Sequence, residues 1–115
     1  MKLVRIYTGD DGESHVEPMD QSEFPFGGPN GTRTPLVPAV GAEIALRREG
    51  FLEFHPAPRR QYMVYLTARV EIGLGDGSSI VMEPGDILQA EDTTGRGHTS
   101  TVLQEGVCLV VRLEE

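Results

Sequence analysis

Two histidines frame the part of the chain best equipped for chemistry, His55 near its beginning and His98 near its end. Between them lie two apolar runs typical of strands, a Gly-Asp-Gly turn and a Pro-Gly-Asp corner. Imidazole is the side chain that most readily serves as an acid, a base or a metal ligand near neutral pH. We expect a β-barrel to bring these two histidines together at one end of a pocket. The third histidine, His15, is expected on the surface.

A strand that begins at Gln61 would present further side chains to the same pocket. The alternation of a strand places Met63, Tyr65 and Thr67 on the face of Gln61. If Gln61 points inward, Met63 and Tyr65 line the barrel, either as ligand contacts or as core. A buried tyrosine needs a partner for its hydroxyl, so Tyr65 is also a candidate for substrate binding or proton transfer.

Charged residues near these strands suggest how a ligand would be held. Arg59 and Arg60 have the fork geometry that binds an anionic substrate, and we take Arg60 as a ligand-binding candidate. The alternative is a solvated or acid-paired doublet. Asp92 opens the loop that precedes His98, where its side chain can bond the loop's own amides. It either stiffens the loop or contacts the ligand.

The rest of the chain supplies short strands and turns. We expect a first strand at 2–7, at the edge of a sheet, and a long proline- and glycine-rich loop at 24–38. A hairpin is expected at 73–77 and a last one around Glu105-Gly106. The other predicted strands cover 13–19, 41–48 (with Ile44 and Leu46 on one face), 51–55, 61–72, 80–82, 87–90, 99–104 and 107–113. The pattern predicts one all-β domain over 1–115, with its barrel core at 41–113.

Composition narrows the function classes. The 115 residues carry a net charge of −8, which argues against a nucleic-acid surface. No apolar run approaches a membrane span, and the first residues do not read as a signal peptide. The single cysteine, Cys108, lies in an apolar run and is expected to be buried. These features favour a cytoplasmic protein without membrane or nucleic-acid partners.

The stretch from about 50 to 113 resembles the small single-domain cupins, in a subgroup with the sequence Asp-Thr-Thr-Gly-x-Gly-His. Pro84-Gly85-Asp86 matches the turn of the second cupin motif, and His98 takes the place of that motif's histidine. At the His, His, Glu and Gly places of the first motif stand His55, Ala57, Gln61 and Ala68, and Val102 replaces the asparagine that ends the second motif.

This resemblance implies a double-stranded β-helix, or jelly-roll, cupin barrel. It also implies a divalent metal site at His55, Gln61 and His98, where a complete cupin site has three histidines and a glutamate. Imidazole suits Zn, Fe, Ni or Cu, and Mn is a further candidate. Without the carboxylate the affinity should be lower, unless Asp92 supplies the missing charge.

The resemblance is compatible with a metal-assisted isomerase, cyclase, lyase or oxygenase that acts on a small metabolite. The fold does not choose between these reactions. An alternative is a metal-free module that binds or senses a small ligand. A third reading is an acid/base enzyme that uses His55 or His98 together with Tyr65. A homodimer is expected, formed through the strand at 2–7.

Overall fold

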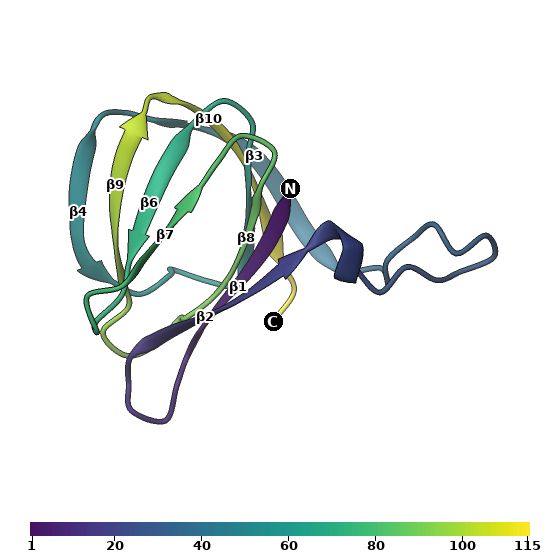
Figure 1. Ribbon diagram of the computed structural model, residues 1–115, viewed down its shortest axis with the longest axis horizontal. Helices are drawn as coiled ribbons and strands as arrows, with labels where there is room; N and C mark the ends of the chain where they lie inside the picture. Colours follow the sequence, from purple (N-terminus) through teal and green to yellow (C-terminus); the bar gives the residue numbers. More distant parts are fainter.

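The computed structural model describes all residues from 1 to 115 and is almost entirely β, as predicted. A six-stranded sheet has the order β2-β1-β8-β5-β10-β3, and a four-stranded sheet has the order β4-β9-β6-β7. The two sheets face each other in Figure 1. The strands are β1 (Lys2–Thr8), β2 (Ser14–Asp20), β3 (Ala39–Arg47), β4 (Gly50–His55), β5 (Gln61–Tyr65), β6 (Arg69–Gly73), β7 (Ser79–Met82), β8 (Ile87–Glu91), β9 (His98–Gln104) and β10 (Gly106–Leu113), with one short 3-10 helix, η1 (Gln21–Glu23).

The predicted strand at 61–72 is wrong as a single element, because it divides into β5 and β6 in opposite sheets. The burial pattern explains the division. Met63 and Tyr65 are buried in β5, at odd positions, whereas Val70 and Ile72 are buried in β6, at even positions. A straight strand cannot change the face it buries, so the chain bends between the two segments and crosses to the other sheet.

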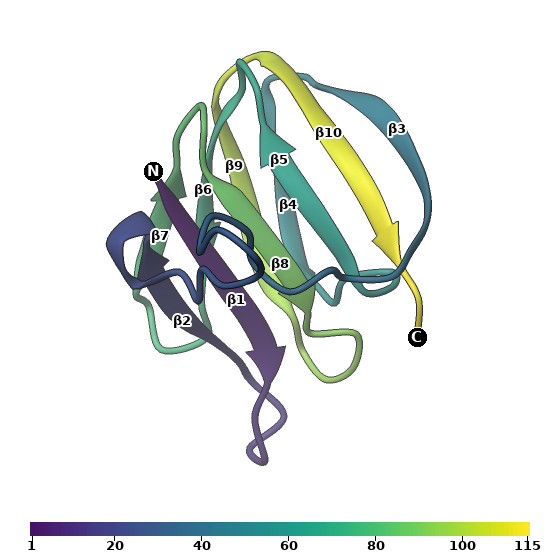
Figure 2. The same cartoon turned by 90° about the vertical axis from the view of Figure 1, so that its right-hand side faces the viewer.

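The strand at 2–7 exists, but its predicted edge position is wrong. β1 lies between β2, with which it pairs antiparallel, and β8, with which it pairs parallel. Val4 and Ile6 on its inner face are fully buried. The predicted extended segment at 13–19 is confirmed as β2, and it covers the edge that β1 was expected to expose. Figure 2 shows this order, with β2 beside β1 and β3 at the opposite side.

The last predicted hairpin is also wrong. β9 pairs with β4 and β6, while β10 pairs with β3 and β5, so the two consecutive strands belong to opposite sheets. The hairpin predicted at 73–77 is confirmed, since Ile72 pairs with Ile80 across β6 and β7, and Gly77 adopts a φ of 88°.

The segment at 24–38 forms the predicted loop, with one isolated bridge between Gly27 and Arg33. It extends away from the two sheets in Figure 1. No helix in the structure has the length and apolar character needed to cross a membrane.

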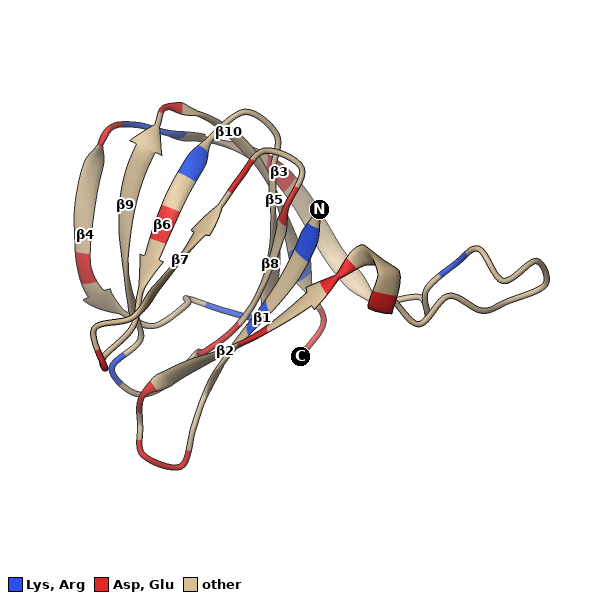
Figure 3. Ribbon diagram, in the orientation of Figure 1, with Lys and Arg blue, Asp and Glu red and all other residues tan.

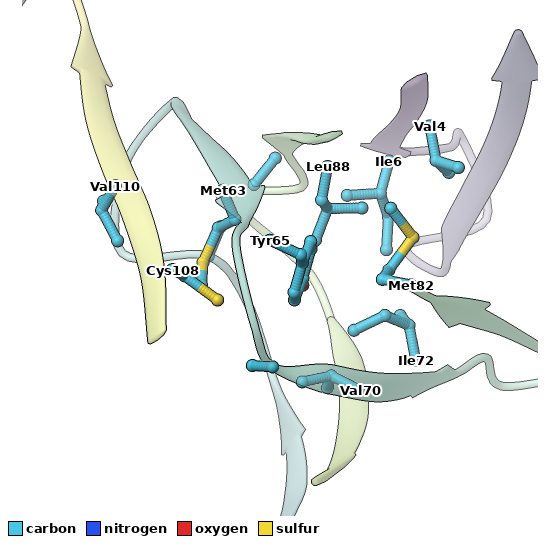
Figure 4. Close-up of a cluster of buried hydrophobic side chains, with 13 residues drawn as sticks. Val4, Ile6, Met63, Tyr65, Val70, Ile72, Met82, Leu88, Cys108 and Val110 are labelled. Atoms are coloured by element: carbon cyan, nitrogen blue, oxygen red, sulfur yellow. The ribbon is translucent and has the colours of Figure 1, made fainter. Parts of the chain in front are cut away.

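The core lies between the sheets and centres on Tyr65. Figure 4 shows its ring between Met63 and Cys108 on one side and Met82 and Leu88 on the other. Cys108 is fully buried, as predicted, and this burial raises the pKa of its thiol. The core side chains come from strands of both sheets.

Candidate functional site

A pocket of about 220 Å³ opens between the sheets, and strands of both sheets line it. The structure brings to its wall most of the site residues that the sequence predicted. These are His55, Gln61, Met63, Tyr65 and His98. Ala57, at the place of the second motif histidine, lines it as well and is 4% exposed.

His98 is the first residue of β9 and is held by a buried carboxylate. Its Nδ1 lies 2.6 Å from Oδ2 of Asp92, and the same oxygen accepts a hydrogen bond of 2.6 Å from the Ser14 hydroxyl. Asp92 is fully buried, and its other oxygen, Oδ1, has no protein partner. Because a carboxylate accepts hydrogen bonds, the proton of neutral His98 is on Nδ1. Its Nε2 therefore keeps a free lone pair.

His55, the last residue of β4, stands directly opposite His98 in the pairing of β4 with β9. Its Nδ1 lies 2.7 Å from the carbonyl oxygen of Glu53, two residues earlier in the same strand. A carbonyl can only accept, so this ring also carries its proton on Nδ1 and has a free Nε2. The ring centroids of the two histidines are 4.8 Å apart.

The loop at 92–97 brings the two histidines together, and Gly97 makes the close approach possible. Gly97 has a φ of 80°, and a Cβ at this position would overlap the carbonyl of His55. The loop is also tied to the β1–β2 turn, since the amide of Arg96 donates to the carbonyl of Gly12 over 3.0 Å. Because only a glycine fits next to the His55 carbonyl, Gly97 is part of the site.

The donor set for a metal consists of two imidazoles and a neutral amide. No group of three or more His, Cys, Asp or Glu side chains is arranged to hold a metal ion. Gln61 supplies a third donor, because only its Nε2 is engaged, 3.8 Å from the sulfur of Met63. Asp92 supports His98 from behind, as an outer carboxylate does in many metal sites. His55, His98 and Gln61 are therefore the residues of this wall that could hold a divalent ion.

Tyr65 is fully buried at the pocket wall, and its hydroxyl has no protein partner. Burial raises the pKa of this hydroxyl strongly, while the charge of Arg47 acts in the opposite direction. The phenol therefore keeps its proton at neutral pH and can serve as a hydrogen-bond donor. Met63 has a double role, because it lines the pocket and also belongs to the core cluster.

Arg60 is not part of the pocket wall. Its Nε donates to Oε2 of Glu91 over 2.8 Å, and its Nη1 donates to the carbonyl of Glu114 over 2.7 Å. This matches the acid-paired alternative for the doublet. Arg59 is exposed. The prediction that His15 lies on the surface is confirmed, since this residue is exposed.

Arg47 and Ser14 belong to the site but were not predicted from the sequence. Ile44 and Leu46 share a face of β3 as expected, but that face is 69% and 57% exposed. Ala45 and Arg47 therefore face inward, and Arg47 lines the pocket. The alternation of side chains along β3 could have predicted this, because Arg47 lies on the face opposite to Ile44 and Leu46. Nothing in the local sequence linked Ser14 to Asp92, which lies 78 residues away.

No protein-family model matches the chain, and the search of curated proteins finds no similar protein.

Proposed function

We propose that this protein binds a small metabolite in the pocket between its sheets, next to a divalent metal ion held by His55, His98 and Gln61. One observation carries the proposal. Both histidines fix Nδ1 to an oxygen acceptor and leave Nε2 free, with their rings 4.8 Å apart in one pocket wall. This is the arrangement in which imidazole binds metals.

We further propose that the fold is a jelly-roll of the cupin type. Two features support it. Within the predicted core, β6 and β7 are the only consecutive strands that pair, and other successive strands lie mostly in opposite sheets. The four positions equivalent to cupin metal ligands, at residues 55, 57, 61 and 98, all line one pocket. Two of these positions, Ala57 and Gln61, have neither an imidazole nor a carboxylate.

In this proposal each residue has a defined task. Asp92 accepts the Nδ1 proton of His98 and so orients its ring. Gln61 completes the donor set, and the Tyr65 hydroxyl donates a hydrogen bond. A bound divalent ion would polarise a carbonyl or enolate oxygen of the metabolite. The apolar wall that includes Ile72, Leu88 and Ala90 excludes water from the reacting atoms.

The alternative is a pocket that works without a metal. The 2.6 Å contact between Asp92 and His98 favours it, because a carboxylate-held imidazole is also a general base. The metal-free alternative is also favoured because the pocket wall offers only two imidazoles and no carboxylate as metal ligands. In that case the protein is either an acid/base enzyme or a binding module without catalysis.

Elemental analysis separates these functions. The chain is purified without an affinity tag or chelator and is then dialysed against Zn, Fe, Ni, Cu or Mn. We expect near-stoichiometric metal in the wild type and in His15→Ala, a control that removes an exposed histidine. The metal should be lost in His55→Ala and His98→Ala. Because His98 is buried, the half-exposed His55 provides the variant that should fold with least disturbance.

Circular dichroism of both variants shows whether they fold. A folded wild type that retains no metal from any of the five ions would overturn the metal proposal and leave the metal-free alternative.

We also propose that the chain forms a homodimer and acts in the cytoplasm. The exposed apolar residues of the edge strands support the dimer, now at β3 and β4 in place of β1. They include Ile44 and Leu46 on β3 and Phe51 and Leu52 on β4. Cys108, a free buried thiol, agrees with a reducing compartment.

A further inference from the structure

The charge of the pocket wall differs from that of the protein as a whole. The chain has a net charge of −8, and Figure 3 shows acidic residues over much of the fold. The wall of the pocket has one arginine, Arg47, and two histidines, but no Asp or Glu. A wall of this kind attracts a negatively charged group.

Arg47 is also unusual among the arginines of this chain. It is half-buried and makes no salt bridge or side-chain hydrogen bond within the protein. Every other half-buried arginine pairs with a glutamate, namely Arg5 with Glu91, Arg60 with Glu91, Arg69 with Glu83 and Arg112 with Glu43. A half-buried guanidinium without an anion is costly, which points to a partner from outside the chain.

A second unpartnered group lines the same pocket as Arg47. The Tyr65 hydroxyl is fully buried, lines the same pocket and has no protein partner. Arg47 is near enough for its charge to act on this hydroxyl and oppose the rise that burial causes in the pKa of Tyr65. A guanidinium and a protonated phenol together are a donor set for a carboxylate.

We propose that the ligand of this pocket is a small carboxylate whose anionic group is bound by Arg47 and accepts a hydrogen bond from Tyr65. This inference rests on the proposed small-metabolite function and names its ligand class. The rest of the ligand extends along the apolar wall toward His55 and His98. A pocket of 220 Å³ has the volume of about seven water molecules, which limits the ligand to a short chain or a single ring.

Benzoate and its neutral isostere benzamide are suitable probes, since they differ in charge but hardly in shape. Binding is followed by NMR titration of the metal-free protein, at equal ionic strength. We expect benzoate to bind roughly tenfold more tightly than benzamide, because a hydrogen bond to a charged group is worth more than a neutral one. We expect Arg47→Gln to remove this difference.

Arg48→Gln is the matched control, because it removes the same charge one residue later, on an exposed side chain outside the pocket wall. It should keep the preference for benzoate. Tyr65→Phe is a second variant that removes one oxygen. It should weaken benzoate binding several-fold without lowering Tm, since the hydroxyl makes no bond within the protein.

Three results would overturn the inference. These are equal affinity for the two probes, an equal effect of Arg47→Gln and Arg48→Gln, or no detectable binding of either probe. None of them depends on the metal content of the protein. A carboxylate preference without metal would keep this inference and reject the metal proposal, and bound metal without a carboxylate preference would do the reverse.

Discussion

His55 and His98 lie side by side in one wall of the pocket, but the regions that hold them differ in burial and in how the side chain is fixed. His98 belongs to an anchored wall that also contains Ser14, Asp92 and Gly97, all of them buried. Its Nδ1 bonds the Asp92 carboxylate, which also accepts a hydrogen bond from Ser14 in β2. Here the position of one ring depends on contacts between distant segments.

His55 belongs to an open edge formed by β3 and β4, where Ile44 and Phe51 are more than half exposed. Its ring bonds only a carbonyl of its own strand. Leu52 lines the pocket and is 55% exposed, so the pocket reaches the surface on this side. The two histidines are therefore held differently, His98 by contacts between distant segments and His55 only by its own strand.

The largest effect should come from Gly97 in the anchored wall. Gly97→Ala should lower the free energy of unfolding by about 4 kcal/mol, since it combines a left-handed φ with an overlap against the backbone of His55. Gly77→Ala is the control, because its φ of 88° is similar but nothing lies near the added Cβ. It should cost about 1 kcal/mol. Equal losses in urea unfolding would show that the loop does not press against β4.

Asp92 should have the next largest effect. Asp92→Ala leaves the Ser14 hydroxyl and His98 Nδ1 without their acceptor in a buried site and should cost about 3 kcal/mol. Glu53→Ala tests the open edge in the same way, but the acceptor of His55 is a backbone carbonyl that survives the change. Its cost should stay within about 0.5 kcal/mol. Similar costs for both variants in urea unfolding would remove the distinction between the two regions.

Lowering the pH below 5 should reduce the free energy of unfolding through Glu91, the residue next to Asp92 in the anchored wall. Burial acts to raise the pKa of Glu91, but its bonds to Arg5 and Arg60 outweigh burial and lower the pKa. The resulting stability is present above the unfolded pKa of about 4.3 and is lost as the pH falls through the lower folded pKa. Glu91→Gln should therefore flatten the fall in unfolding free energy below pH 5, as measured by denaturant titration. An unchanged slope would contradict this origin.

The smallest effect on folding is expected at the open edge. Ile44 is 69% exposed, so Ile44→Glu should change the unfolding free energy of the single chain by about 0.5 kcal/mol or less. The same change should prevent dimer formation, because it places a charge in the proposed apolar interface. Sedimentation equilibrium measures the mass of both proteins. A wild type that stays monomeric at every concentration would refute the dimer.

The sequence allowed the prediction of the strands and of five residues in the pocket wall, because alternation and turn residues are local signals. It did not reveal that β5 and β6 lie in opposite sheets, because every even position from 62 to 72 is apolar and the sequence therefore shows one continuous apolar face. The bond between Ser14 and Asp92 could not be predicted, since it depends on the pairing of β1 with β8, elements far apart in the chain.

For a related reason, the sequence did not show that Arg47 lines the pocket and that Arg60 does not. Arg60 directly precedes β5 and Arg47 ends β3. Only the three-dimensional structure shows that Glu91 pairs with Arg60 and that no acidic residue shares the pocket wall with Arg47. The difference depends on which acceptors lie nearby, and those of Arg60 are the Glu91 carboxylate of β8 and the backbone carbonyl of Glu114.

The most direct test of the central claim is the tautomer of each imidazole, read from long-range proton–nitrogen NMR correlations before and after addition of Zn²⁺. We predict that neutral His55 and His98 both carry the proton on Nδ1, and that Zn²⁺ shifts Nε2 of these two rings together while His15 stays unchanged. A proton on Nε2 of either ring in the metal-free protein, or a zinc response confined to one of the two rings, would contradict the account.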